Sequence, residues 1–170
     1  MNAATVNYNW VVSEKKILKT SKENLWKIIS SPSNLENFHP FCLKNPVIKW
    51  PGNNSVDAIY YKNGMVYERN FYEWNINQGY KLVIGKHKAK KSHVFWELKQ
   101  IGDEVEIKIE IYPHLFNKKR KLLFALPFIL IVKPKLKNYL KHVLNGLDFY
   151  VKTNQKVEIN QFGINNWFSK

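Results

Sequence analysis

The longest amphipathic pattern in the chain runs from Pro134 to Thr153 and predicts a single helix. Apolar residues recur there at intervals of three and four, with lysines on the opposite side. The apolar face consists of Leu136, Tyr139, Leu140, Val143, Leu144, Leu147, Tyr150 and Val151. Pro134 is tolerated in a first turn, where its missing N–H has no partner. Gly146 costs about 1 kcal/mol relative to alanine inside a helix, so it predicts the close approach of another segment.

The N-terminal third predicts one strand followed by short helices. Residues 8–18 alternate raggedly between apolar and polar, as in a strand. Thr20 and Glu23 have the spacing of a capping box, which predicts that a helix begins at Thr20. Residues 31–33 (Ser-Pro-Ser) end that helix, and residues 34–39 predict a second, shorter one. Two prolines then bracket an irregular segment at 40–46, and a short strand is expected from Val47 to Trp50.

Two hairpins follow, and each predicts a register. Asn63-Gly64 indicates a two-residue turn. The pairs predicted on one side are Tyr60–Tyr67, Ala58–Arg69 and Val56–Phe71, with Asp57 and Ile59 on the other. Gly102-Asp103 indicates a second turn, which pairs Leu98–Ile107, Trp96–Ile109 and Val94–Ile111 on the apolar side and Lys99–Glu106 and Glu97–Lys108 on the charged side. Residues 80–87 predict a strand between the hairpins.

The segment from 113 to 133 leaves three alternatives open. Residues 117–121 are polar and basic, and residues 122–132 are apolar on all sides, with Pro127 inside. The apolar run could be a buried helix kinked at Pro127, a lid over a pocket, or a membrane contact beside a basic cluster. The tail, residues 154–170, carries aromatic side chains and is expected to pack back on the domain.

Composition favours one cytoplasmic domain spanning residues 1–170. The 170 residues are 45% hydrophobic and 15% aromatic, which excludes a disordered chain. The single cysteine, Cys42, cannot form an internal disulfide, and the N-terminus has no apolar signal core. No apolar run approaches the ~18 residues of a membrane span.

The net charge of +14 raises the question of anionic partners. Only two of the 27 basic residues, Arg69 and Arg120, are arginines, whereas proteins that read bases and phosphates favour arginine. We therefore do not expect a nucleic-acid partner. The charge is uneven, because residues 111–147 contain basic residues and no acid, so a weak contact with an anionic membrane surface stays open.

The order of elements and four short motifs resemble the START-like superfamily, also called SRPBCC. The motifs are HPFC at 39–42, NPVIKWPG at 45–52, YPH at 112–114 and NQFG at 160–163. They are similar to a bacterial subfamily whose members are often labelled polyketide cyclase/dehydrase or lipid-transport-like. The resemblance implies an α+β helix-grip fold, in which a curved antiparallel sheet of about six to seven strands wraps around a long C-terminal helix, with one or two short helices after the first strand. It also implies a cavity for an apolar or amphipathic small molecule.

Catalytic motifs are missing from the sequence. It contains no GxSxG, no HExxH, no CxxC and no phosphate-binding glycine loop. His39 and Cys42 lie three apart, but two ligands do not make a structural metal site. We expect His39 to cap a turn, Cys42 to be buried, and neither a metal nor another cofactor to be needed.

Arg69 is the candidate binding residue with the strongest physical argument. An arginine that faces an apolar interior must meet a ligand or pair with an acid such as Glu73 or Glu14, because an unpaired buried charge is costly. The full set of expected ligand-binding residues is Arg69, Tyr60, Tyr67, Trp96, Ile109, His114, Tyr139, Val143 and Leu147.

Three functions remain open at this point. The first is binding or carrying a hydrophobic or amphipathic small molecule, such as a lipid or polyketide. The second is a cyclase or dehydratase, whose acid/base groups would come from Arg69, His114, Tyr60 and Tyr139. The third is a peripheral membrane protein that uses residues 118–132.

Overall fold

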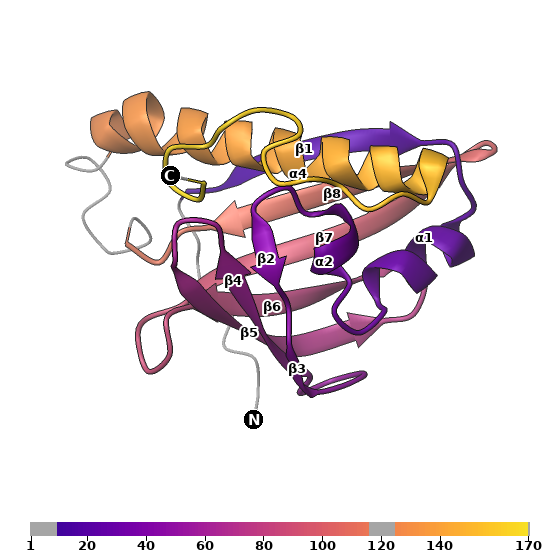
Figure 1. The fold of residues 1–170 in the computed structure, drawn as a ribbon, viewed down its shortest axis with the longest axis horizontal. Helices are drawn as coiled ribbons and strands as arrows, with labels where there is room; N and C mark the ends of the chain where they lie inside the picture. The colour runs from indigo at the N-terminus through magenta and orange to yellow at the C-terminus, as the bar shows by residue number, and fades with distance from the viewer. Residues whose placement is uncertain (1–9, 116–124, 170) are drawn as a thin grey trace.

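One curved antiparallel sheet and one long helix form most of the computed structural model, which describes residues 10–115 and 125–169. The strands are β1 (Val12–Leu18), β2 (Cys42–Lys44), β3 (Val47–Lys49), β4 (Val56–Tyr61), β5 (Val66–Asn75), β6 (Gly79–Gly85), β7 (Ser92–Ile101) and β8 (Glu104–Tyr112). The helical elements are α1 (Lys22–Ile29), α2 (Leu35–Phe38), the π-helical turn η1 (Phe128–Val132) and α4 (Lys133–Thr153). The sheet order is β1-β8-β7-β6-β5-β4-β2, with β3 paired to β4 (Figure 1).

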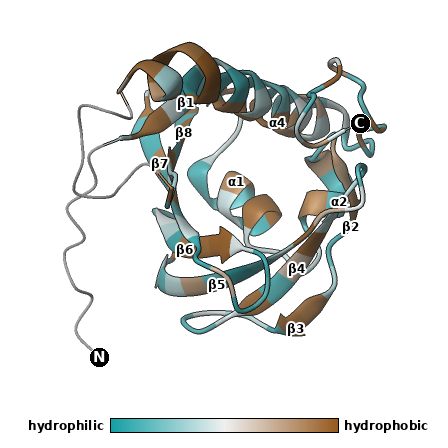
Figure 2. Cartoon of the chain, turned by 90° about the vertical axis from the view of Figure 1, so that its left-hand side faces the viewer, coloured by the Kyte–Doolittle hydropathy of each residue, from teal (hydrophilic) through white to brown (hydrophobic). Residues whose placement is uncertain are grey.

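The sheet curls toward α4, which packs along β1; α1 lies within the concave space, and α2 lies between β2 and α4 (Figure 2). This arrangement confirms the predicted α+β helix-grip architecture. The described residues contain eight strands, more than the six to seven expected. The difference lies partly in β2, because the segment at 40–46 that we expected to be irregular pairs with β4. No helix among the described residues is both long and apolar enough to cross a membrane.

The long helix confirms the amphipathic pattern but begins earlier than Pro134. Residues 125–127 are already helical, and η1 connects them to α4. In η1 the N–H of Lys133 donates to the carbonyl of Phe128, five residues earlier. In a regular α-helix the ring of Pro134 would clash with the carbonyl four residues before it. The π-helical turn η1, which directly precedes α4, relieves this conflict. Residues 116–124, which include the whole basic segment at 117–121, lie outside the described residues.

Gly146 is the point at which α2 approaches α4, as its position in the helix predicted. A Cβ atom built on Gly146 would lie 2.0 Å from the carbonyl oxygen of Phe38, the last residue of α2. Any side chain at this position would therefore force the two helices apart.

The first helix begins one residue later than its capping box predicted. Ser21, not Thr20, is the N-cap, and its hydroxyl accepts the N–H of Asn24 at 3.1 Å. The hydroxyl of Thr20 instead accepts the side-chain amide of Asn24 at 2.8 Å. Both hydroxyls thus serve the same helix terminus.

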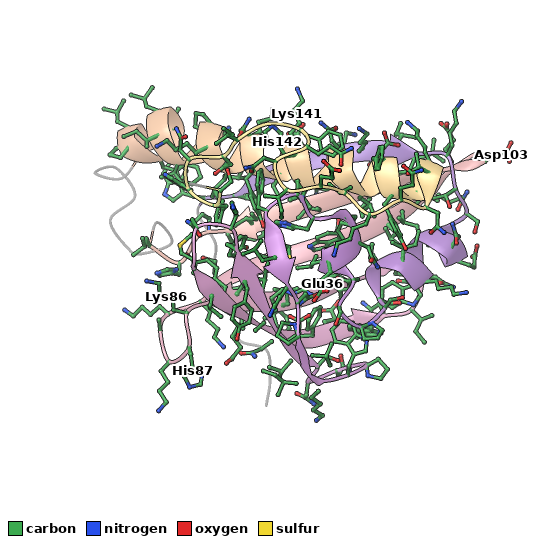
Figure 3. All side chains as sticks on the ribbon, viewed as in Figure 1. Glu36, Lys86, His87, Asp103, Lys141 and His142 are labelled. Atoms are coloured by element: carbon green, nitrogen blue, oxygen red, sulfur yellow. The ribbon has the colours of Figure 1, made fainter. Side chains whose placement is uncertain are left out.

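The β7–β8 hairpin has the register that the sequence predicts. Trp96 pairs with Ile109, and Glu97 pairs with Lys108 on the opposite side. Asp103 lies at the tip of this hairpin, away from the body of the sheet (Figure 3). Apolar pairs on one face and opposite charges on the other therefore specified the same register.

The β4–β5 hairpin differs from its predicted register by one residue. Its connection has three residues, 62–64, because the N–H of Tyr61 donates to the carbonyl of Met65 at 2.8 Å. Gly64 has a φ of +83°, the left-handed conformation that a three-residue loop requires at this position. Asp57 consequently pairs with Arg69, where Ala58 was expected.

This one-residue change reverses the facing of β4, since neighbouring residues of a strand point to opposite sides. Tyr61 and Asp57 point into the protein and are 2% and 0% exposed, respectively. Tyr60 points outward and is 41% exposed. The predicted inward position of Tyr60 was therefore wrong, whereas Arg69 on β5 does point inward.

Candidate functional site

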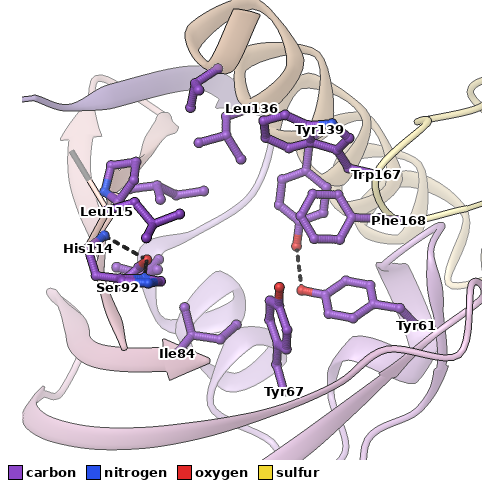
Figure 4. A pocket seen from close by; sticks show the side chains of 14 residues that line it. Tyr61, Tyr67, Ile84, Ser92, His114, Leu115, Leu136, Tyr139, Trp167 and Phe168 are labelled. Carbon is purple, nitrogen blue, oxygen red and sulfur yellow. Dashed lines mark hydrogen bonds between the residues drawn. The ribbon is translucent and has the colours of Figure 1, made fainter. Parts of the chain in front are cut away.

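A cavity of about 220 Å³ lies between the sheet and the first turns of α4 (Figure 4). It is lined by Tyr61, Tyr67, Ile84, Ser92, Val94, Ile111, Pro113, His114, Leu115, Val132, Leu136, Tyr139, Trp167 and Phe168. None of these described lining residues is an Asp, Glu, Lys or Arg. Leu115 lines the cavity and is 58% exposed, so the cavity reaches the surface there.

Three tyrosine hydroxyl groups provide most of the polarity on one wall of the cavity. Figure 4 shows the side chains of Tyr61, Tyr67 and Tyr139 directed toward one another. The hydroxyl oxygens of Tyr61 and Tyr139 are 3.2 Å apart. Behind them, Nε2 of His39 lies 2.8 Å from the Tyr139 hydroxyl, and His39 itself is buried. Residues from β4, β5, α4 and the C-cap of α2 thus meet at a single polar point in an apolar wall.

Burial keeps these groups uncharged. Burial, followed by the positive charge of Arg69, lowers the pKa of His39 to about 3. Burial also raises the pKa of Tyr61 and of Tyr139 above the ordinary value for tyrosine. Near neutral pH the imidazole is therefore neutral, and both hydroxyls retain their protons. The group can form hydrogen bonds but provides no base with a pKa near neutrality.

A smaller polar group lies on the opposite wall. The hydroxyl of Ser92 accepts the backbone N–H of His114 at 3.1 Å and lies 3.3 Å from Nδ1 of the same residue. The pair comes from β7 and from the turn after β8, as Figure 4 shows. The wall between the two polar groups is apolar, so a ligand would meet polar contacts mainly at the ends of the cavity.

The C-terminal tail forms part of the cavity wall. The ring of Phe168 lies 4.4 Å from that of Tyr139 and 4.9 Å from that of Tyr61, measured between ring centroids. The side-chain amide of Asn165 donates to the backbone carbonyl of Lys135 at 3.2 Å, which fixes the tail to α4. The amide of Asn63 donates to the carbonyl of Trp167 at 2.7 Å and joins the tail to the β4–β5 hairpin.

Arg69 lies outside this cavity, so its predicted role as the polar anchor of the cavity is corrected. Its Nε donates to Oδ1 of Asp57 at 2.7 Å, and Nη2 donates to the second carboxylate oxygen. Nη2 also reaches Oδ1 of Asn45 at 3.4 Å. Burial opposes the charge of Arg69, but the carboxylate of Asp57 outweighs this effect and raises its pKa. We expected an acid to compete for Arg69, but named Glu73 or Glu14, because the predicted register placed Asp57 on the other face.

The C-terminal half of α4 packs against a filled interior. Trp96, Ile109, Val143 and Leu147 are buried and do not line the cavity, which corrects their predicted role as lining residues. The ring of Trp96 instead contacts that of Phe38 in α2, with centroids 6.3 Å apart. The close approach of α2 to Gly146 therefore places Phe38 in this end of the interior, away from the cavity.

Of the expected binding residues, the structure brings Tyr67, His114 and Tyr139 together in the cavity. Tyr61, which lines the cavity, and His39, which lies behind it, were not among the expected residues, for different reasons. A three-residue loop at 62–64 would have placed Tyr61 inward, so its signal was present in the sequence. The contact of His39 with Tyr139 joins distant segments and has no local signal, although its ring does cap a turn as expected, accepting the N–H of Phe41.

Among the described residues, no group of three His, Cys, Asp or Glu side chains is placed to hold a metal ion. Cys42 is a buried free thiol, and burial raises its pKa to about 12. A thiol in this state is unreactive, so Cys42 acts as a small apolar side chain, as expected.

The fold has close counterparts among solved structures, although no protein-family model and no curated protein sequence matches the chain. A START superfamily protein from Mycobacterium smegmatis superposes with a TM-score of 0.65 at 15% identity, covering 85% of this chain and 99% of the other. Protein MLL2253 from Mesorhizobium loti gives 0.65 at 14% identity, covering 84% and 97%. DynU16, a protein of the dynemicin biosynthetic locus, gives 0.65 at 9% identity and covers 86% of this chain. The chain spans about half, 48%, of DynU16.

Proposed function

The chain has the START-like helix-grip fold, and from this premise we propose that it binds or carries a hydrophobic or amphipathic small molecule, such as a lipid or polyketide. The ligand would occupy the cavity between the sheet and the first turns of α4. The observation that carries the proposal is that this cavity has mostly apolar walls, with a cluster of converging tyrosine hydroxyl groups at one end and the Ser92–His114 pair at the other. The likeness to DynU16, from a biosynthetic locus, and to a START superfamily protein supports it at the level of fold. The cytoplasmic location proposed from the sequence fits the free thiol of Cys42.

A cyclase or dehydratase in the same cavity is less well supported. General acid–base catalysis works best when the pKa of the catalytic group lies near the operating pH. The pKa of His39 is lowered to about 3, and those of Tyr61 and Tyr139 are raised by burial. These shifts favour a binding role for the hydroxyl cluster.

Filling the cavity should weaken ligand binding without unfolding the protein. We expect the neutral dye N-phenyl-1-naphthylamine to bind with micromolar affinity, about −8 kcal/mol. Leu136 lines the cavity from α4, so Leu136→Trp should occupy the space and weaken dye binding by about tenfold or more, as measured by fluorescence titration. Leu130→Trp is the matched control, because Leu130 lies on the same continuous helix and is 68% exposed. An absence of dye binding, or equal binding by Leu136→Trp and the unmodified protein, would contradict the proposal.

A second candidate function, contact with an anionic membrane surface, is favoured by an exposed apolar patch at the start of the long helix. The patch consists of Leu126, Ile129, Leu130 and Ile131, which are 69%, 49%, 68% and 51% exposed. Figure 2 shows hydrophobic colour on these first turns. Lys133, Lys137 and Lys141 follow on the same helix, and Lys141 points away from the sheet (Figure 3). We propose that the patch enters the headgroup region while these lysines attract anionic lipids.

This contact should be weak and dependent on salt. We expect binding to vesicles containing phosphatidylglycerol that decreases as salt rises, with little binding to phosphatidylcholine alone. A Leu126→Ser/Leu130→Ser variant should sediment with the anionic vesicles about tenfold less. Ile48→Ser is the control, because Ile48 is 67% exposed on β3, far from the long helix. Tight, salt-insensitive sedimentation, or an equal loss in the control, would show that this model of the contact is wrong.

A further inference from the structure

The hydrogen-bond chain of His39, Tyr139 and Tyr61 has a direction, and its starting point is fixed by the backbone. The N–H of Phe41 lies 3.2 Å from Nδ1 of His39 and can only donate. Nδ1 must therefore accept. A neutral imidazole carries a single proton, so that proton is on Nε2. Nε2–H then donates to the hydroxyl oxygen of Tyr139, 2.8 Å away.

The direction continues through Tyr139. With His39 donating to its oxygen, Tyr139 must place its own proton elsewhere. The hydroxyl oxygen of Tyr61, 3.2 Å away, is the acceptor that the described residues offer. A buried hydroxyl that left its proton unpaired would lose free energy, so Tyr139 donates to Tyr61.

The last proton of the chain belongs to Tyr61, which lines the cavity. Because Tyr61 accepts from Tyr139, its own O–H is free to meet an acceptor on another side. Figure 4 shows its hydroxyl directed inward beside that of Tyr67. The ring centroids of Tyr61 and Tyr67 are 5.5 Å apart, without a hydrogen bond between these two described side chains. We propose that the cavity recognises an uncharged apolar ligand through a carbonyl oxygen that accepts the O–H of Tyr61. This inference rests on the proposed binding function and specifies the class of ligand.

The charge distribution supports an uncharged ligand. Among the described residues, the lining contains no Lys or Arg to balance a carboxylate, and Arg69 is already bound to Asp57 in a two-point contact. Transferring an anion from water to such a wall is strongly unfavourable without a paired charge. A neutral carbonyl loses far less hydration and gains a directed donor.

Three rigid molecules of nearly the same shape test this inference. Fluorenone offers a carbonyl acceptor, fluorene offers neither donor nor acceptor, and carbazole offers only an N–H donor. Their dissociation constants can be measured by displacement of N-phenyl-1-naphthylamine. We expect fluorenone to bind about 2- to 12-fold more tightly than fluorene, the ratio that one net neutral hydrogen bond provides. Carbazole should bind no more tightly than fluorene.

Tyr61→Phe should reduce the fluorene-to-fluorenone ratio of dissociation constants to about one. Tyr60→Phe is the matched control, because Tyr60 is the neighbouring residue on the outer face of β4 and should preserve the ratio. If none of the three compounds binds, the proposed function fails. If all three bind equally, or carbazole binds best, the function stands and the inference about the carbonyl is overturned.

The direction of the hydrogen bonds from His39 through Tyr139 to Tyr61 can be measured separately. Long-range ¹H–¹⁵N correlation spectra distinguish the two neutral forms of histidine, and the signals of His39 can be assigned by their loss in His39→Gln. We expect the proton on Nε2 and an unprotonated Nδ1. A proton on Nδ1 would reverse the hydrogen-bond chain, so that Tyr61 donates to Tyr139 and offers the cavity only an acceptor oxygen, and it would overturn the inference.

Discussion

Replacing Asp57 with asparagine is expected to lower the free energy of unfolding by about 3–5 kcal/mol. Asp57 and Arg69 are almost completely buried, at 0% and 3% exposed, and the guanidinium contacts both carboxylate oxygens. Removing the negative charge leaves Arg69 charged in an apolar interior, and breaking a buried pair in this way typically costs that much. At about 2–4 °C per kcal/mol for a chain of this size, the melting temperature should fall by roughly 10 °C.

Two further variants separate the charge effect from a general sensitivity of the sheet. Glu73→Gln breaks the half-buried surface ion pair with Lys81, in which Nζ lies 2.9 Å from the carboxylate oxygen, and should cost less than about 1 kcal/mol. The double variant Asp57→Leu/Arg69→Met removes both buried charges and should recover much of the loss of Asp57→Asn. Urea unfolding measures all three. Equal losses for Asp57→Asn and Glu73→Gln would show that the buried pair does not have the expected role.

Acid should destabilise the protein through His39, and His39→Gln should remove this effect. The folded-state pKa of about 3 lies below the ordinary 6.5, so between these values the unfolded chain binds more protons. The stability from neutral His39 is therefore complete above pH 6.5 and is lost as the pH falls toward 3. The slope is about 1.4 kcal/mol per pH unit, and the total loss is about 4–5 kcal/mol.

The free energies of unfolding of the unmodified protein and of His39→Gln are best compared between pH 6.5 and 4.5. Burial also lowers the pKa of His93 and of His142, so the unmodified protein contains their contributions as well. Because His39→Gln keeps these two residues, the difference in urea unfolding between the two proteins isolates His39 and should reach about 2–3 kcal/mol. His87→Gln is the control, because His87 is exposed. The carboxylate partner of His87 is Glu68, whose pKa is lowered to about 2 by hydrogen bonds from Lys91 and His87. Parallel pH profiles for the unmodified protein and His39→Gln would contradict the prediction.

The two hairpins show where the sequence suffices to predict the register. In β7–β8, the pair Trp96–Ile109 and the pair Glu97–Lys108 require the same alignment, so a mistake would have placed charges against the core. In β4–β5, Asn63-Gly64 is compatible with a two-residue turn and with a three-residue loop, since both accept glycine in a left-handed conformation. Neither face of β4 carried enough opposing charge to decide between them.

The location of the cavity could not be predicted from periodicity. The pattern along α4 identifies Tyr139, Val143 and Leu147 as one buried face, and the structure confirms their burial. Periodicity indicates which side of a helix leaves water but not what occupies the space beside it. That depends on α2, whose contact with Gly146 fills one end of the interior, and this is a contact between segments far apart in the chain.

The position of β1 at the edge of the sheet, paired with β8, also governs how quickly the fold can form. Strands β4 to β8 follow one another along the chain and pair as neighbours, so they can assemble through short loops. β1 cannot pair until β8 has been formed, because Val12 pairs with Ile111, which lies far along the sequence. During synthesis, β1, α1 and α2 leave the ribosome before the surfaces that will cover them exist. Until β1 pairs with β8, the edge of β8 exposes a row of unpaired backbone groups, and in this interval the chain is most open to association with other chains.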